Sequence, residues 1–306
     1  MRRVSKRHLE SRVWGASRAG TVRDVPQPPD PFSLRRTALA VSVLDDIDLE
    51  PYGRGVVLRG GAPVTVEWRE LRRVIAGADP ESELARRRVR RHLVARRIVA
   101  DLSRDELAAK ARPVGFAVDD VLHPGVGWVR ERPLGGALDL GVGVVGGGSD
   151  PDAVVVLPEA ALDAAGIDAS LWWPVARSYL ERMGAIAVER LKMDSSGVLR
   201  PIGDCDVVTL LGSRVLRAYL TAGEAGGLRG AAVPMRRRGW FDLSRIDPAF
   251  ALAAAGAVDE EERGFSRPLL LTADEVTLAP AGGRPAEIVL RDPAVAAVAE
   301  RAVRWR

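Results

Sequence analysis

The sequence has little cysteine, no long apolar run and no recognisable export signal. Its only cysteine, Cys205, excludes a framework of internal disulfides. No stretch approaches the roughly 20 apolar residues that a bilayer-spanning helix needs. The basic start Met1–His8 leads into Glu10, not into an apolar segment, so it does not resemble a secretory signal. We therefore expect a cytoplasmic protein that does not contact a membrane.

Aromatic residues are also scarce, at 5% of the chain, whereas hydrophobic residues make up 47% and charged residues 28%. This composition is close to that of an average globular protein and excludes wholesale disorder. With 306 residues, the chain is long enough for a sizeable core and for about two domains. The core should consist mainly of Ala, Val and Leu.

Lysine occurs only at Lys6, Lys110 and Lys192, so nearly all of the 45 cationic residues are arginines. The bland explanation is codon bias in a GC-rich genome. The distribution is nevertheless uneven: residues 1–112 carry 24 Lys and Arg against 15 Asp and Glu, a net charge of +9, and the remainder has a net charge of −5. This asymmetry predicts either an anionic partner or the docking of one half of the protein on the other.

Composition and periodicity predict three regions and an α+β fold. Residues 1–36 hold arginines and the run Val25–Pro31, with prolines that exclude a helix or central strand, and indicate a flexible N-terminal arm. Residues 37–113 read as a basic region of helices and strands, with strands at 39–44, 55–58 and 64–66 and helices at 67–76 and 79–101. Residues 114–306 form a larger region in which helices alternate irregularly with mainly antiparallel strands.

Residues 141–146 spell the dinucleotide-binding pattern G-x-G-x-x-G directly after a predicted strand. In a dinucleotide site the third glycine opens a helix that meets the pyrophosphate. Here more glycines follow, and then the strand-like segment 153–157, so a strand, a turn and a second strand are the better interpretation. No P-loop pattern is present either, and we expect no cofactor.

Asp204 and Asp206 flank Cys205 at the start of a predicted strand over 206–211. Alternate residues of a strand share a face, so the two carboxylates could hold Mg²⁺ or Mn²⁺ in a phosphoryl- or nucleotidyl-transfer enzyme. Two aspartates at a strand edge are also common in turns, where their side chains hydrogen-bond to their own backbone. The histidines His8, His92 and His123 lack metal-ligand spacing. We therefore expect no metal site other than this alternative.

The densest feature is the arginine-rich segment 83–97 within the helix predicted at 79–101. At 100° per residue, five of its arginines form a band along the helix: Arg86, Arg87, Arg90, Arg91 and Arg97. A second cluster, Arg236–Arg238, precedes Trp240 and Phe241, which could stack on bases or anchor a turn. These arginines could contact phosphates or an acidic protein surface, or they could pair with carboxylates of the C-terminal region.

The first hypothesis is thus a non-catalytic, intracellular binding or regulatory protein that recognises nucleic acid or an acidic protein through this arginine-rich helix. The residues predicted to bind are Arg86, Arg87, Arg90, Arg91, Arg97, Arg236, Arg237 and Arg238. The alternatives are the metal-assisted enzyme using Asp204 and Asp206, and a structural or assembly subunit. The sequence leaves open whether the protein is an enzyme, and it leaves the oligomeric state open.

Overall fold

The computed structural model describes residues 31–124, 127–133, 135–146, 154–194, 196–242 and 262–279. Helices and antiparallel strands are interspersed along this part of the chain, and every strand pairing in it is antiparallel. The predicted α+β class is confirmed. Of the predicted N-terminal arm, residues 1–30 lie outside the described part.

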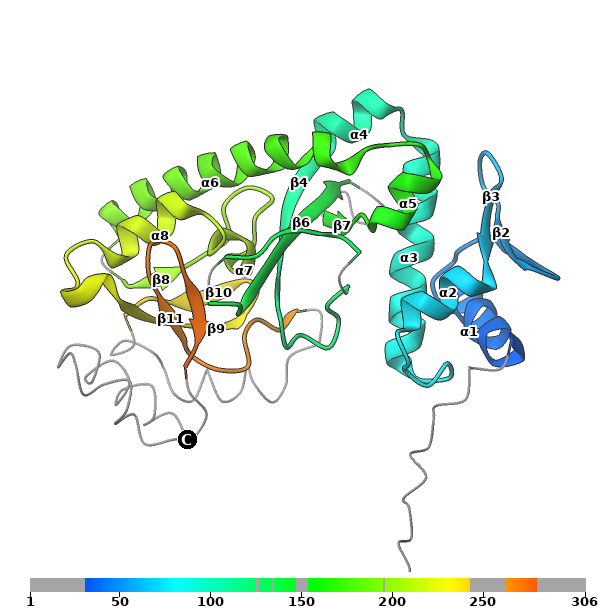
Figure 1. Cartoon of the computed structure of the whole chain (residues 1–306), viewed down its shortest axis with the longest axis horizontal. Coiled ribbons are helices and arrows are strands. Elements are labelled where there is room, and N and C mark those ends of the chain that lie inside the picture. Colours follow the sequence, from blue (N-terminus) through cyan, green and yellow to red (C-terminus); the bar gives the residue numbers. More distant parts are fainter. Residues whose placement is uncertain are drawn as a thin grey trace, which may run out of the picture.

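The N-terminal module comprises three helices around a three-stranded sheet of order β1-β2-β3 (Figure 1). Its elements are α1 (Pro31–Leu44), β1 (Leu49–Tyr52), β2 (Gly55–Leu58), β3 (Val64–Glu67), α2 (Trp68–Ile75) and the first half of α3 (Glu83–Asp101). Its core contains Leu34 of α1, Val56 of β2, Leu71 of α2 and Leu93 of α3. The strands predicted at 55–58 and 64–66 and the two later helices are confirmed.

The prediction of a strand over 39–44 was wrong, because these residues form the second half of α1. The apolar run hides a helical pattern that begins earlier, inside the predicted arm. Leu34, Ala38 and Val41 recur at intervals of four and three residues and are all fully buried. This spacing places them on one face of a helix, so packing against the module core decides the conformation.

Helix α3 belongs to two hydrophobic cores. Its N-cap is Ser82, whose side chain accepts a hydrogen bond from the backbone of Ala85. Val89 and Leu93 lie in the core of the module, whereas Ile98 and Val99 lie in a second core with residues of the remaining chain. The helix stands between the two parts of the molecule in Figure 1 and joins them.

The rest of the described chain, which we call the body, contains two sheets covered by helices (Figure 1). One has the order β4-β6-β5, with β7 also paired to β6; the other has the order β12-β11-β9-β10-β8. The body consists of α4 (Arg104–Lys110), β4 (Ala111–Ala117), β5 (Val129–Glu131), β6 (Leu138–Val145), β7 (Val154–Val156), α5 (Glu159–Ala164), η1 (Ala169–Leu171), α6 (Trp173–Met193), β8 (Val198–Leu199), α7 (Val207–Leu210), α8 (Arg214–Thr221), η2 (Ala225–Gly227), β9 (Arg229–Met235), β10 (Arg238–Trp240), β11 (Leu269–Leu271) and β12 (Val276–Leu278).

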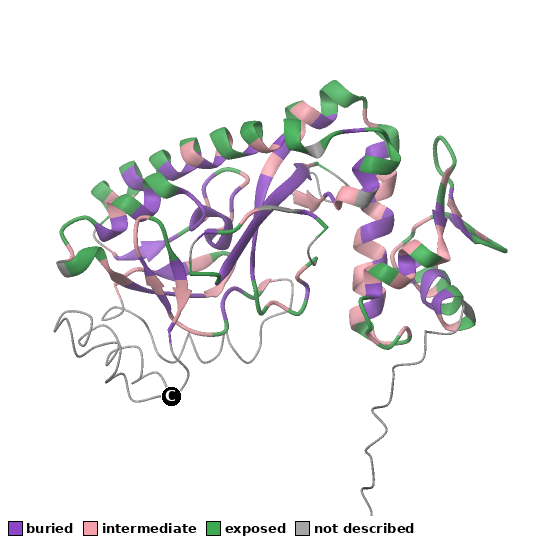
Figure 2. Ribbon diagram, viewed as in Figure 1, coloured by how far each residue is buried: buried purple, intermediate pink, exposed green. Residues whose placement is uncertain are grey.

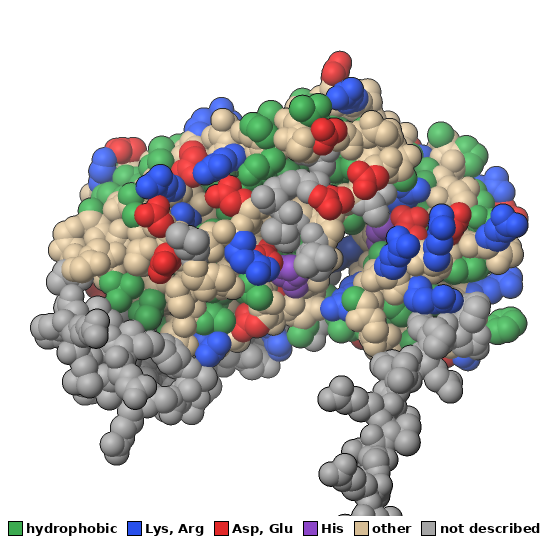
Figure 3. Space-filling model, viewed as in Figure 1, with side chains coloured by type: hydrophobic (Ala, Val, Ile, Leu, Met, Phe, Trp, Pro, Cys, Tyr) green, Lys and Arg blue, Asp and Glu red, His purple; other side chains and the backbone are tan. Residues whose placement is uncertain are grey.

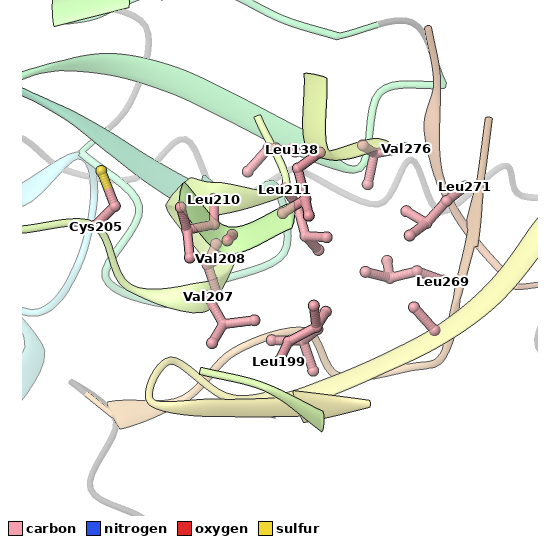
Figure 4. Close-up of a cluster of buried hydrophobic side chains, with 14 of the residues drawn as sticks. Leu138, Leu199, Cys205, Val207, Val208, Leu210, Leu211, Leu269, Leu271 and Val276 are labelled. Atoms are coloured by element: carbon pink, nitrogen blue, oxygen red, sulfur yellow. The ribbon is translucent and has the colours of Figure 1, made fainter. Parts of the chain in front are cut away.

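Strands β4 and β6 form the buried centre of the body, as the purple ribbons in Figure 2 show. Beside them, Leu138 and Leu211 face Leu269 and Leu271 of β11 in one apolar cluster, and Cys205 lies at its edge (Figure 4). Cys205 is fully buried, as predicted for a small core residue. The strand predicted at 206–211 was wrong: Asp206 accepts a hydrogen bond from the backbone of Thr209 and caps α7.

The glycine-rich motif at 141–146 lets the Trp128 ring pack closely on β6 and lets the chain turn after that strand. Strand β6 continues through it to Val145 and pairs with β7, so the two expected strands are confirmed, while residues 147–153 between them lie outside the described part. A Cβ atom on Gly141 would lie only 1.9 Å from Cε3 of Trp128. Gly146 has a positive φ of 75°, which suits glycine at the turn after β6. The first and third glycines of the pattern thus have roles that involve no phosphate.

We therefore predict that Gly141→Ala lowers the free energy of unfolding by about 1–3 kcal/mol, because the buried Trp128 ring must shift. Urea unfolding followed by tryptophan fluorescence measures this change. Gly127→Ala is the matched control, since a Cβ there meets nothing within 4 Å. Equal stabilities of the two variants would contradict the packing role of Gly141.

Candidate functional site

The outer arginines of α3 are engaged by carboxylates of the same module. Nε of Arg90 lies 3.1 Å from Asp45, and Nη1 of Arg86 lies 3.6 Å from it. Arg86 also donates to Glu83 over 2.9 Å, and Arg87 donates to Glu83 over 3.0 Å. The side chains of Arg86 and Arg87 are only about a quarter exposed. Much of the positive charge on this part of the predicted band is therefore neutralised within the chain.

The remaining arginines of the band hold backbone in place. Nη1 of Arg91 donates to the carbonyl of Leu122 over 3.0 Å, and the guanidinium lies over the ring of Phe116. Arg97 donates to Asp101 over 2.6 Å and to the carbonyl of Ala62 over 2.9 Å. Asp45, Glu83 and Asp101, which pair with this band, belong to residues 45–101, and Asp120 of the body interacts electrostatically with Arg91. The body also contributes carbonyl groups.

Arg88 strengthens this junction from the same helix, although it lies outside the predicted band. It donates to the carbonyls of Ile75 in the module and of Val121 in the body, over 2.7 and 3.2 Å. Together with Arg91, it ties α3 to the loop at 118–124. Two of the seven arginines of α3 thus join the two parts of the protein.

The second arginine cluster is divided among three environments. Arg236 donates through Nε to Asp206 over 2.7 Å and through Nη2 to the carbonyl of Gly115 over 2.5 Å. Arg237 is 76% exposed and lies 3.0 Å from Glu262. Arg238 lies over the ring of Trp240, with 5.1 Å from Cζ to the ring centroid. The three residues do not form one cationic surface.

The predicted carboxylate pair is also occupied by protein groups. Oδ2 of Asp204 accepts hydrogen bonds from Arg112 and from the hydroxyl of Tyr179. Asp206 accepts a hydrogen bond from Arg236 and also caps α7. The described residues contain no group of three or more His, Cys, Asp or Glu side chains suited to a metal ion. This geometry gives the metal-assisted alternative no support.

A polar cluster forms around the buried Asp139 and includes His123 of the 118–124 loop. This cluster was not predicted from the sequence. Asp139 of β6 is completely buried, and Nε2 of His123 lies 3.0 Å from its Oδ2. Nη2 of Arg132 donates to the same carboxylate over 2.5 Å. The ring of His123 also packs edge-on against Phe116 and Trp128. Asp139 sits in an apolar run, so only its partners, which are 16 and 7 residues away, could have revealed the cluster.

Asp120 lies beside this cluster, and its carboxylate is held between charges. Burial raises the pKa of Asp120, although a hydrogen bond from the backbone of Leu122 and the positive charges of Arg236 and Arg91 oppose the shift. Nη1 of Arg236 lies 3.7 Å from its Oδ2. The cluster holds in place the loop to which Arg88 and Arg91 of α3 donate hydrogen bonds. We therefore assign it a structural role.

Three exposed arginines lie close together in the chain's N-terminal module, at the β1–β2 turn and on α2. Arg54 and Arg73 are exposed and form no ion pair within the described part of the chain, and Arg69, also exposed, pairs only with its neighbour Glu67. Arg69 and Arg73 are one turn apart on α2. The carbonyl of Arg54 accepts a hydrogen bond from the backbone of Trp68, so the turn lies beside the start of α2. We call Arg54, Arg69 and Arg73 the α2 face; Figure 3 shows many blue side chains over this module.

No protein-family model, curated protein or solved structure matches the chain. No helix in the described residues combines the length and the apolar character needed to cross a membrane.

The raised pKa of Asp120 predicts a particular pH dependence of stability. The folded protein holds the proton more tightly than the unfolded chain, so the stabilisation is complete below the ordinary Asp pKa of 3.8 and is lost as pH rises through the folded pKa. Urea unfolding across this range should therefore show wild type losing stability relative to Asp120→Asn as pH increases. Asp163→Asn, at an exposed position on α5, is the control. A gain of wild type over Asp120→Asn with rising pH would show that the burial argument is wrong.

Proposed function

We propose that the protein is a non-catalytic, intracellular binding protein for an anionic macromolecule, and that nucleic acid is the partner. The observation that carries the proposal is the α2 face. Its Arg54 and Arg73 are exposed and make no ion pair within the described residues, whereas Arg86, Arg87 and Arg90 of α3 meet carboxylates. An unpaired, exposed guanidinium can bind phosphate without first breaking an internal pair.

The residues around the α2 face favour nucleic acid over an acidic protein. Stable protein interfaces have an apolar centre, whereas phosphate contacts need only guanidinium or ammonium groups. The exposed large apolar residues of the module lie mostly on α1: Phe32, Leu39, Val43 and Leu44. Two partly exposed aromatic residues lie beside the α2 face, Tyr52 at the end of β1 and Trp68 at the start of α2, and an aromatic ring can stack on a base.

In this proposal the arginines of α3 have a supporting role. They hold the module on the body. Helix α3 also packs against α2 in the core of the module, so it contributes to binding indirectly. Direct contact between nucleic acid and the residues predicted from the sequence stays a prediction. These residues are Arg86, Arg87, Arg90, Arg91, Arg97 and Arg236–Arg238. Their intramolecular partners favour the α2 face over them.

The proposal predicts that Arg54→Glu/Arg73→Glu weakens nucleic-acid binding at least tenfold at low salt. Each lost phosphate contact should also lower the slope of log K against log salt by about 0.9 for duplex DNA. Fluorescence anisotropy with labelled duplex and single-stranded oligonucleotides over a salt series measures both quantities.

The matched control is Arg190→Glu/Arg200→Glu, which makes the same change of charge at exposed positions of the body. This variant should retain most of the affinity. If both double variants lose affinity equally, the attraction is diffuse and the α2 face is not the site. If wild type binds polyglutamate but no oligonucleotide, the partner is an acidic protein and the nucleic-acid proposal fails.

A further inference from the structure

Helix α1 presents a second exposed surface, which differs in character from the α2 face. Its inner side, with Leu34, Ala38 and Val41, is fully buried in the module. On its outer side Leu39 is 39% exposed and Val43 is 81% exposed. These two residues are one helical turn apart and form a short apolar stripe. In Figure 1 the helix lies at the outer edge of the module.

The charges at the two ends of α1 oppose the helix dipole. Arg35 and Arg36 lie near the N-terminal end, whereas Asp45 and Asp46 directly follow the last residue, and the helix itself contains no acidic residue. A helix dipole favours the reverse arrangement, with negative charge at the start and positive charge at the end. A second helix packed in the antiparallel direction would bring opposite charges together at both ends.

Two of these end charges are available for such a contact. Arg36 lies 2.5 Å from Glu81, and Asp45 is held by Arg86 and Arg90. Arg35 and Asp46 are exposed, and neither forms an ion pair within the described ranges. An antiparallel pairing that sets Leu39 against Val43 of a second copy brings Arg35 of each copy toward Asp46 of the other. One surface thus supplies both halves of a self-complementary contact, as a two-fold dimer requires.

We propose that α1 is the interface of a homodimer in which two copies of the helix pack antiparallel about a two-fold axis near the level of Val41. The stripe packs against a second copy of this chain, because in the antiparallel direction Arg35 of each copy lies near Asp46 of the other. Two 14-residue helices bury far less than a standard interface, so the dimer is weak and reversible, in the micromolar range. The inference does not rest on nucleic-acid binding, because the α2 face is a separate surface.

Cysteine cross-linking tests both the contact and its direction. In the antiparallel pairing, Leu39→Cys and Val43→Cys each bring the two thiols to within roughly 6 Å along the axis, whereas two copies of Phe32→Cys lie roughly 27 Å apart. Under mild oxidation in the absence of nucleic acid, the first two variants should form disulfide-linked dimers and Phe32→Cys should not. The native Cys205 is buried and does not interfere.

Val215→Cys, an exposed position on α8, is the control for random collision. Sedimentation equilibrium of the unmodified sequence at up to 200 µM should show a reversible dimer, and Arg35→Glu should weaken it about tenfold at low salt. A monomer at all concentrations, or cross-linking no faster than in Val215→Cys, overturns the dimer. Rapid cross-linking of Phe32→Cys indicates parallel helices and overturns the antiparallel arrangement.

Discussion

The structure depends on one shared helix, α3, and on how its arginines are satisfied. Its first half completes the core of the module and its second half enters a core of the body. An α-helix this rich in arginine can occupy such a position only if its guanidinium groups find partners. Asp45 and Glu83 supply carboxylates, and the carbonyls of Val121 and Leu122 supply the link to the body. The arrangement of the two parts follows from these contacts.

Satisfying α3 internally determines which surface is left for a partner. The most arginine-dense segment of the sequence becomes a joint, whereas Arg54 at the β1–β2 turn and Arg73 on the short helix α2 are exposed and form no ion pair within the described residues. The cluster that His123 and Arg132 form around the buried Asp139 extends the joint into the body. A cluster of charge in a sequence is therefore a poor guide to a binding surface unless the neighbours in space are known.

Much of the fold could be predicted from local patterns, because capping and alternation are written in adjacent residues. The capping box of Ser103 and Glu106 and the hairpin of β11 and β12 are of this local kind, and the predicted strands at 55–58 and 64–66 are confirmed. The segments 39–44 and 206–211 were misassigned because a short apolar run fits either a strand or a buried helix. There the deciding factors are the packing of Val41 and the cap formed by Asp206. The pairing of Asp45 with Arg90 and of His123 with Asp139 is tertiary, and no spacing reveals it.

The central claim is that the α3 arginines are engaged within the protein whereas those of the α2 face are open to a partner. Chemical modification of arginines with a dicarbonyl reagent, located by mass spectrometry, tests it most directly. The account predicts that Arg54 and Arg73 react quickly and become protected when an oligonucleotide is added, while Arg86, Arg90 and Arg91 react slowly in both states. Fast reaction of the α3 arginines, with protection confined to them, would contradict it.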